Sequence, residues 1–375
     1  MFAVTNVTIH QPDHTIPNGT IWVDKGKIIR IEHNTVEDAI DGGGFNLVPG
    51  FIDSHIHGAM GADVMDDIEA LKTMAASLPV EGTTAFLPTT ITSPETDIAS
   101  ALERIRDFKL EKAPHAEVIG AHVEGPFIAK SKAGAQPVEC IRRPELALVK
   151  EWHKKGVLRV ITMAPELEGA AEVMEWLSEK GTVISAGHTE AVYEDIVSAQ
   201  EKGLQHLTHL CNAMTGVHHR NVGAVGAAML AKELYSEIIP DRIHISDEML
   251  RILYSMIGPE RLILITDAMR AKGLGDGAYT LGGQEVNVKG TRATLADGTL
   301  AGSVLMMDQG VRNMIEVCGA DWYAIMKMAS ENPARRYGIW DRKGSIEVGK
   351  DADFLLVDDH FHIHSTFCRG EEVKK

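Results

Sequence analysis

The sequence lacks the features of a disulfide-stabilised or membrane-spanning protein. Its four cysteines, Cys140, Cys211, Cys318 and Cys368, form no CxxC pair and no even framework. This usage favours reduced thiols and a cytoplasmic protein. No apolar run approaches the ~20 residues that a bilayer-spanning helix needs. The start, MFAVTNVTIHQPDHTI, alternates apolar and polar residues and therefore predicts a strand, not a signal peptide. We expect no membrane partner.

Positive charge is also scarce. Lysine and arginine number 37 against 53 aspartate and glutamate residues, which gives a formal net charge of −16 at pH 7. Such a chain repels polyanions, so we expect no nucleic-acid partner. An anionic small molecule would need a local basic pocket.

The 375 residues suffice for a barrel of roughly 250 residues plus a second unit. Residues 1–50 and 344–375 both read as short alternating strands separated by turn residues. Because the ends of a domain that carries an insertion usually lie together, we predict that these two segments form one small β-sandwich. Residues 51–343 would then form the second domain.

Between the two ends, eight short apolar runs alternate with helical stretches. The runs begin at Val48, Thr83, Glu117, Val157, Thr182, Leu204, Glu237 and Arg261. The helical stretches cover residues 66–78, 94–109, 144–155, 170–180, 191–202, 223–234 and 246–257. This alternation predicts an α/β fold, a (β/α)8 TIM-like barrel whose strand ends share one mouth. Residues 279–302 predict a β-hairpin beside that mouth.

Residues that bind metal or transfer protons stand at or near the ends of these runs. They are His55, His57, Glu124, His188, His209, His244 and Asp267. Because the mouth of such a barrel holds its chemistry, the pattern indicates a metal-dependent enzyme.

An HxH motif alone is weak. His360, His362 and His364 repeat the spacing, and there we interpret it as one face of a strand. The motif His55-Ile56-His57 differs because a Gly-Phe-Ile-Asp strand precedes it and Gly58 follows, which favours metal ligands.

Glu124 follows an apolar strand in HVEGPFI, where a carboxylate is costly to bury without a cation or an arginine partner. His188 and His209 taken singly fit hydrogen-bonded core residues equally well. Together with Glu124 they form the mixed set that suits zinc, iron or a similar divalent ion. His206 we interpret as structural.

Two further residues have alternative readings. Asp267 ends the apolar run RLILIT, where a carboxylate can take a proton from water and return it to a leaving group, or instead cap a helix from Ala268. Arg220 in HHRNVG is the candidate for the basic pocket, although an arginine before a helix is ordinarily solvated.

The joint set of motifs carries a resemblance over nearly the whole chain. The motifs are HIHG at 55, HVEGPFI at 122, AGHT at 186, HLCNAM at 209, HHR at 218, ITDAMRAKGLGDG at 265, DGTLAGS at 297 and ENPAR at 331. In this order they resemble the N-acetylglucosamine-6-phosphate deacetylase family of the amidohydrolase superfamily.

The resemblance implies a site. It makes Glu124, His188 and His209 the core ligands, with His55 and His57 supporting a second ion, so that one or two divalent ions are expected. Asp267 matches the catalytic aspartate. The residues implied in substrate binding are Gln136, Asn212, Ala213, Arg220, His244 and Leu300. In the family, Arg220 reaches the site of a neighbouring subunit, which implies a homodimer.

The implied reaction is hydrolytic deacetylation of N-acetylglucosamine 6-phosphate to glucosamine 6-phosphate and acetate, in amino-sugar catabolism and recycling. Many members have histidine where this chain has Gln136, which can donate a hydrogen bond but carries no positive charge. Two rival hypotheses stay open: hydrolysis of another amide, such as a cyclic ureide or a non-phosphorylated N-acetyl amino sugar, and a catalytically silent barrel scaffold. The metal and the acceptance of galactosamine or mannosamine analogues are open as well.

Overall fold

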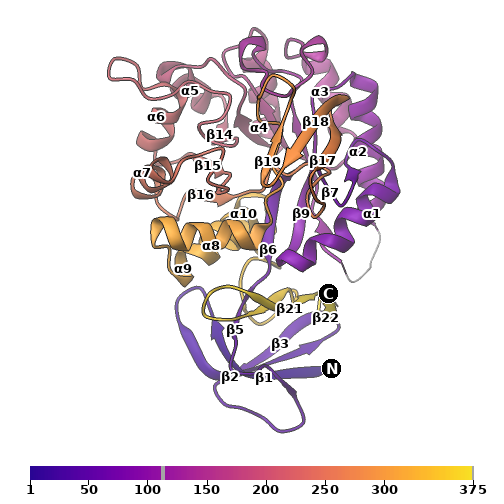
Figure 1. Cartoon of the computed structure of the whole chain (residues 1–375), viewed down its shortest axis with the longest axis vertical. Helices are drawn as coiled ribbons and strands as arrows, with labels where there is room; N and C mark the ends of the chain where they lie inside the picture. Colours follow the sequence, from indigo (N-terminus) through magenta and orange to yellow (C-terminus); the bar gives the residue numbers. More distant parts are fainter. Residues whose placement is uncertain (111–114, 374–375) are drawn as a thin grey trace.

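The computed structural model describes residues 1–110 and 115–373. A barrel surrounded by helices stands on a smaller β domain (Figure 1). The chain starts in the β domain, runs through the barrel and returns to the β domain at its end, so both termini lie at the same end of the molecule.

Eight parallel strands form the barrel, as the alternating runs predict. They are β6 (Phe51–Ile56), β9 (Thr83–Thr90), β11 (Ala121–Glu124), β12 (Leu158–Met163), β13 (Val183–Ala186), β14 (Leu204–Leu207), β15 (Tyr235–Ile238) and β16 (Leu262–Leu264), each hydrogen-bonded to the next. A short strand, β10 (Glu117–Val118), precedes β11 and pairs with β9.

The barrel closes through the segment that follows β16. The backbone N–H of Asp267 donates to the carbonyl of His55 at 2.8 Å, and that of His57 donates to Ala268 at 2.8 Å. The residues after Asp267 therefore continue the barrel wall beside β6 and do not begin a helix, which removes the helix-cap reading of Asp267.

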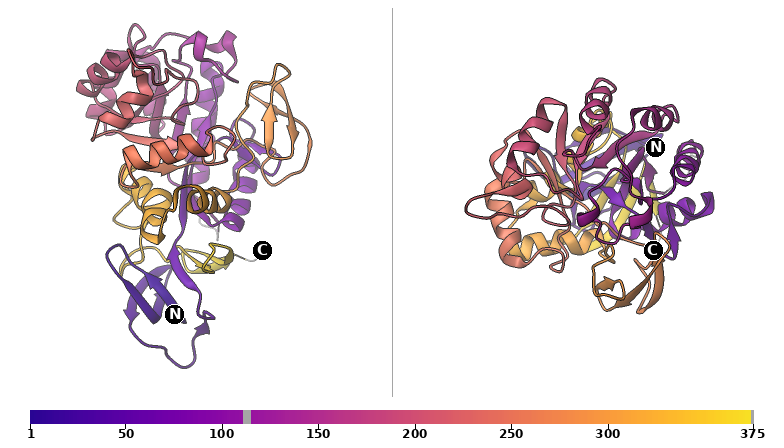
Figure 2. Two further views of the ribbon diagram at one scale, coloured as in Figure 1. Left: turned by 60° about the vertical axis from the view of Figure 1, so that its left-hand side comes forward. Right: turned by 90° about the horizontal axis from the view of Figure 1, so that it is seen from above.

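The helices surround the strands on the outside (Figure 2, right). Those between strands are α1 (Ile68–Ser77), α2 (Glu95–Lys109), α3 (Leu146–His153), α4 (Ala170–Glu179), α5 (Tyr193–Glu201), α6 (Gly223–Leu230) and α7 (Asp247–Ile257), and they match the seven predicted stretches. After β16 come α8 (Met307–Cys318), α9 (Trp322–Met326), the π-helical turn η4 (Lys327–Glu331) and α10 (Asn332–Arg336). The 3₁₀ turns are η1 (Leu78–Glu81), η2 (Lys130–Lys132) and η3 (Val138–Cys140).

Helix α7 shows why these segments are helical. The Ser246 hydroxyl accepts a hydrogen bond from the N–H of Met249 and caps the first turn. Leu250, Leu253 and Ile257, spaced three and four apart, are buried against the barrel.

The β domain joins both ends of the chain in one hydrogen-bonded sheet. Its strands are β1 (Phe2–His10), β2 (Thr15–Asp24), β3 (Lys27–Glu32), β4 (Ile40–Asp41), β5 (Asn46–Pro49), β20 (Phe354–Val357), β21 (Ile363–Cys368) and β22 (Glu371–Val373). The antiparallel pair β5–β20 links residues about 310 positions apart, with Leu47 opposite Leu356. The predicted pairing of the two ends is confirmed. The boundaries at residues 50 and 343 stay a prediction.

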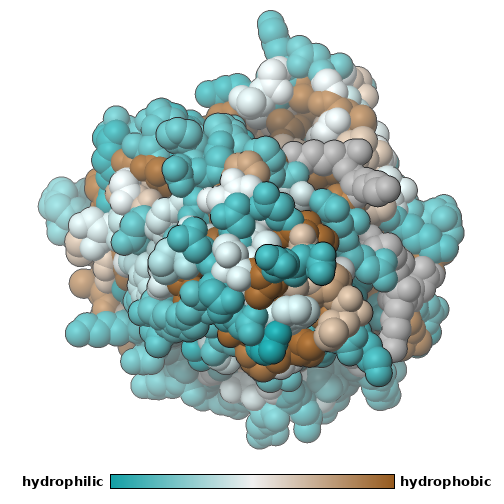
Figure 3. Space-filling model, turned by 90° about the horizontal axis from the view of Figure 1, so that it is seen from below, coloured by the Kyte–Doolittle hydropathy of each residue, from teal (hydrophilic) through white to brown (hydrophobic). Residues whose placement is uncertain are grey.

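The β domain has a core of its own, and it lies at the end of the barrel away from the mouth (Figure 1). The predicted strand face of His360, His362 and His364 is only partly correct: His364 lies in β21, whereas His360 lies in the turn before it and His362 just ahead of the strand. All three side chains are exposed and alternate with buried Phe361 and Ile363. Seen from this side, the surface is predominantly hydrophilic with apolar residues in small groups (Figure 3).

An excursion projects beside the mouth (Figure 2). It contains three strands where the sequence predicted a hairpin: β17 (Gly277–Leu281), β18 (Gln284–Lys289) and β19 (Arg292–Thr294). The small pair β7 (Gly58–Ala59) and β8 (Ala62–Asp63) lies after β6. Buried Ile91, Met269 and Val286 anchor the excursion to the barrel. None of the helices in the described ranges is long and apolar enough to cross a membrane.

Candidate metal centre and active site

Six side chains from five barrel strands converge at the mouth. They are His55 and His57 on and after β6, Glu124 at the end of β11, and His188, His209 and Asp267 in the turns after β13, β14 and β16. His188, His209 and Asp267 have left-handed backbones, with φ of 49°, 31° and 48°. A non-glycine residue there costs about 1–3 kcal/mol, and such strain gathers at functional sites.

The first group consists of Glu124, His188 and His209. The Oε1 atom of Glu124 lies 3.2 Å from the Nε2 atom of His188 and 3.0 Å from that of His209, and the two nitrogens are 3.1 Å apart. All three side chains are buried. The described partners of Glu124 are histidines and Gln136, so the arginine-bridge reading does not hold.

The second group shares Glu124 as its neighbour. The Nε2 atoms of His55 and His57 lie 3.3 Å apart, and each faces Oδ1 of Asp267, at 3.5 Å and 3.2 Å. The other Glu124 oxygen, Oε2, lies 3.3 Å from Nε2 of His57. Glu124 therefore stands between the two groups: Oε2 faces His57, and Oε1, which faces His188 and His209, also lies 3.6 Å from Nε2 of His55.

Hydrogen bonds on the far side of the rings determine which nitrogens face the centre as lone pairs. Nδ1 of His188 lies 2.7 Å from the carbonyl oxygen of Lys132, and Nδ1 of His57 lies 3.0 Å from that of Thr89. A carbonyl only accepts, so both Nδ1 atoms carry a proton, and in the neutral form of each ring the Nε2 atom presents a lone pair. Lone pairs that point at one another repel unless a cation lies between them.

The electrostatics favour a cation. Burial opposes charge on His57, but Asp267 and Glu124 raise the pKa of its ring to about 9, so that at neutral pH its Nε2 atom takes up a positive charge, either as a second proton or as a metal ion in its place. Burial would also raise the pKa of Asp267, yet His55 and His57 hold that pKa at about 2. In the same way the neighbouring histidines hold the pKa of Glu124 well below its ordinary value against its burial. The carboxylates stay ionised and create the negative potential that a divalent cation neutralises.

The residues present fit a metal. Each of the two groups offers three nitrogen and oxygen donors within 4.8 Å of one another, the mixed set preferred by zinc and iron. The predicted ligand residues are thus brought together by the fold, and their assignment as ligands stays a prediction.

A cavity of about 380 Å³ opens over this centre. Its lining includes His57, Glu124, Gln136, His188, His209, Asn212, Ala213, His244, Asp267 and Leu300, which the sequence had proposed, and also Ile91, Ser131, Lys132, Gly134, Ala135, Leu281, Thr299 and Gly302. His55 lies directly beneath, fully buried. His206 is buried in the barrel outside the cavity lining, in keeping with a structural role.

Two of the predicted substrate-binding residues, Gln136 and Arg220, have surroundings that the sequence did not indicate. The Nε2 atom of Gln136 donates to Oε2 of Glu124 at 2.6 Å, and its Oε1 accepts from the N–H of Thr92 at 2.8 Å, so this amide orients Glu124 as well as facing the cavity. Arg220 is exposed and outside the cavity lining, where its guanidinium donates to Nε2 of His219 at 2.6 Å.

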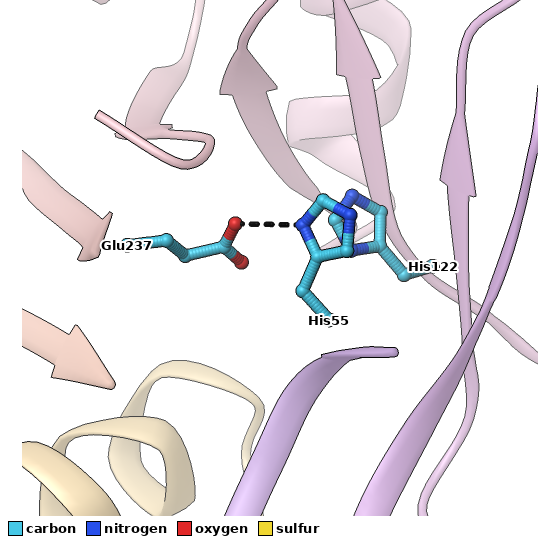
Figure 4. A group of neighbouring side chains, drawn as sticks. All are labelled: His55, His122 and Glu237. Carbon is cyan, nitrogen blue, oxygen red and sulfur yellow. Dashed lines mark hydrogen bonds and ion pairs between the residues drawn. The ribbon is translucent and has the colours of Figure 1, made fainter. Parts of the chain in front are cut away.

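Sequence reasoning missed three residues. Lys132 is the only lysine or arginine among the described residues that line the cavity. Glu237 accepts a hydrogen bond from Nδ1 of His55 at 3.0 Å deep in the barrel (Figure 4). His122, beside His55 in the same view, bonds Thr162 and Ser54. A signal existed for Glu237, because an acidic residue inside an apolar strand run needs a buried partner.

The fold and this centre define a metal-dependent hydrolase of the barrel type. Residues 46–373 match the Amidohydrolase family, and the chain belongs to that family. It is 40% identical to N-acetylglucosamine-6-phosphate deacetylase from Bacillus subtilis (strain 168), over 98% of this chain and 96% of the relative. It is 38% identical to N-acetylgalactosamine-6-phosphate deacetylase from Escherichia coli O157:H7, over 87% of each. The crystal structure of N-acetylglucosamine-6-phosphate deacetylase from Thermotoga maritima superimposes with a TM-score of 0.91 at 33% identity, covering all of both chains.

Proposed function

We propose that the protein hydrolyses the acetamide of N-acetylglucosamine 6-phosphate to glucosamine 6-phosphate and acetate, as a step in amino-sugar catabolism and recycling. The observation that carries the proposal is an ionised aspartate, Asp267, 3.2 Å from a ring nitrogen of His57 on the floor of a cavity lined by the Glu124, His188 and His209 group. The names of the relatives supply the substrate.

The five ligand candidates would hold one or two divalent ions of the zinc or iron type. When bound, such an ion polarises the amide carbonyl and lowers the pKa of water. Asp267 accepts the proton of the attacking water as the new C–O bond forms at the acetyl carbon. When the C–N bond breaks, Asp267 returns that proton to the departing amine nitrogen.

The part of the cavity lined by Lys132 binds the phosphate in this proposal. The Nζ atom of Lys132 lies 3.5 Å from the carbonyl oxygen of Met214, which places its ammonium group beside the Asn212–Ala213 segment. A chain of net charge −16 needs a local basic group to bind an anion, and Lys132 supplies that group. His244, whose Nδ1 is 2.7 Å from Oδ2 of Asp241, borders the same cavity and contacts the sugar or its phosphate. Binding energy from the phosphate holds the reacting amide in place.

The working form is a cytoplasmic homodimer in which Arg220 completes the phosphate site of the neighbouring subunit. Its exposed position outside the cavity of its own chain supports this arrangement. The four free cysteines are compatible with a reducing compartment.

A substrate panel tests the proposal. Purified enzyme should hydrolyse N-acetylglucosamine 6-phosphate with a higher kcat/KM than free N-acetylglucosamine or a cyclic ureide. The panel includes N-acetylgalactosamine 6-phosphate, because one relative is named N-acetylgalactosamine-6-phosphate deacetylase. Equal turnover with and without the 6-phosphate would contradict the assignment, and no turnover of any amide by a protein that retains its ions would favour a silent scaffold.

A further inference from the structure

We propose that Glu237 is a positioning residue which holds the two groups of metal-ligating side chains together and sets the affinity of the ion bound on the side of His55 and His57. The proposal rests on the metal-dependent function proposed above. It assigns a role to a buried carboxylate on β15 that the reaction itself does not use.

Glu237 bonds to both ligand groups at once. Its side chain is fully buried, and Oε2 accepts from Nδ1 of His55 at 3.0 Å and from the backbone N–H of His209 at 3.4 Å. Its own backbone carbonyl accepts from the N–H of Leu210 at 2.8 Å. Glu237 on β15 is therefore hydrogen-bonded to β6 on one side and to the strained turn after β14 on the other.

The carboxylate points at His55 across the interior of the barrel (Figure 4). Because a carboxylate at this distance accepts from Nδ1, the proton of His55 lies on that nitrogen and the lone pair lies on Nε2, toward His57 and Asp267. A negatively charged acceptor also makes the imidazole a stronger donor to a metal.

Glu237 is not itself part of a third ion site with His55 and His122. Both ring nitrogens of His122 are engaged, Nε2 with the hydroxyl of Thr162 at 2.7 Å and Nδ1 with the carbonyl of Ser54 at 3.2 Å. His122 thus has no free lone pair to offer. Within the described residues, Oε1 of Glu237 has no hydrogen-bond partner, and Nδ1 of His206 lies 4.0 Å from it.

Burying a carboxylate of which only one oxygen is hydrogen-bonded costs several kcal/mol of desolvation, which the rest of the fold has to offset. The two ligand groups depend on it unequally. A carboxylate only accepts, whereas a glutamine amide can either accept from Nδ1 of His55 or donate to it, so His55 is no longer held in one tautomer if the charge is removed. His209 remains directed by its backbone turn. The ion on the His55 side should therefore be lost first.

Glu237→Gln tests this, because it removes the charge and keeps the volume. The control is Glu81→Gln, at a buried carboxylate paired with Lys272 (2.6 Å) that contacts none of the six converging side chains. Ions per chain and their dissociation constants are measured by equilibrium dialysis with zinc. We expect the weaker-bound ion of Glu237→Gln to lose about 10–100-fold in affinity, with the other ion near wild type and Glu81→Gln unaffected.

Three outcomes would overturn the assignment: wild-type affinities for both ions in Glu237→Gln, equal losses at both, or a single ion in the wild type. A wild type that binds no ion would instead overturn the proposed function. If Glu237→Gln does not fold without metal, it is refolded with zinc and the release of each ion to a chelator is timed. Release of one ion should then be faster than in the wild type, and unchanged release of both would contradict the role of Glu237.

Discussion

Oδ1 of Asp267 and Nε2 of His57 lie 3.2 Å apart across the seam where the first and last strands of the barrel meet. Backbone hydrogen bonds lock this seam, from the N–H of Asp267 to His55 and from that of His57 to Ala268. Closing the barrel is thus the same event as bringing the proton-transferring carboxylate to the metal ligands.

Glu124→Gln should lower metal content and turnover together. The amide keeps the shape of the side chain but removes the charge that both ligand groups share. Elemental analysis and the deacetylation rate are measured on the same preparation. Full activity in metal-stripped Glu124→Gln protein would mean that these residues are not the metal site.

Asp267→Asn should separate chemistry from binding. Asparagine has nearly the same volume but cannot accept a proton, so kcat should fall by on the order of 10²-fold or more. The affinity for the phosphorylated sugar should change little. A variant with a normal single-turnover rate but weakened binding would make Asp267 a binding residue.

Lys132→Met should raise KM for the phosphorylated sugar by roughly 10–100-fold, the value of one charged hydrogen bond, and change kcat little. The backbone carbonyl that orients His188 stays in place, because only the side chain is altered. The matched control is Lys130→Met, at an exposed lysine two residues earlier that does not line the cavity. The phosphate contact is supported if the loss is confined to phosphorylated substrates, and an equal loss on free N-acetylglucosamine would refute it.

Arg220→Ala should likewise raise KM for the phosphorylated sugar much more than it lowers kcat, because arginine clasps phosphate through two parallel hydrogen bonds. If the active site is shared between subunits, mixed dimers of two inactive variants should regain activity. When Arg220→Ala and Asp267→Asn chains are co-folded in equal amounts, about half the dimers are mixed, and each mixed dimer holds one intact site.

Roughly a quarter of all sites should then behave as wild type at low substrate concentration, although neither parent does. Native mass spectrometry verifies that mixed dimers are present. Absence of recovery in their presence would place Arg220 outside the neighbouring site.

Glu117→Gln should lower stability in a pH-dependent way. Burial would raise the pKa of Glu117, but Arg342, bonded through both nitrogens at 2.8 Å and 2.6 Å, and Lys343 hold it at about 2 against an ordinary value of 4.5. A depressed pKa contributes stability that is present above 4.5 and lost as the pH falls through 2. At pH 7 the free energy of unfolding of the wild type should exceed that of the variant by on the order of 3 kcal/mol. Thermal unfolding should show the difference in Tm narrowing between pH 4.5 and 2, and a constant gap would contradict the ion pair as its cause.

Much of the barrel was accessible from the sequence because its signals are local. Apolar runs alternate with amphipathic stretches at the periods of strands and helices, and seven of the eight strands and α1–α7 were found where these patterns predicted them. The run from Glu237 was placed too late: β15 spans Tyr235–Ile238, and His244 lies in the loop after it. The excursion after β16 was less well predicted. Its third strand, β19, is only three residues long, too short for an alternating pattern to show.

The sequence by itself determined the donor types, their order along the chain and their positions at strand ends, since these follow from residue identity and local periodicity. Tertiary structure alone decided which donors meet. Glu124 and His209 are 85 residues apart and touch only because the barrel closes, and Glu237 meets His55 across 182 residues for the same reason. Local sequence patterns do not predict such contacts, because the pattern around a buried carboxylate in a strand is the same whether its partner is an arginine, a metal ligand or a metal. Packing in three dimensions selects the partner.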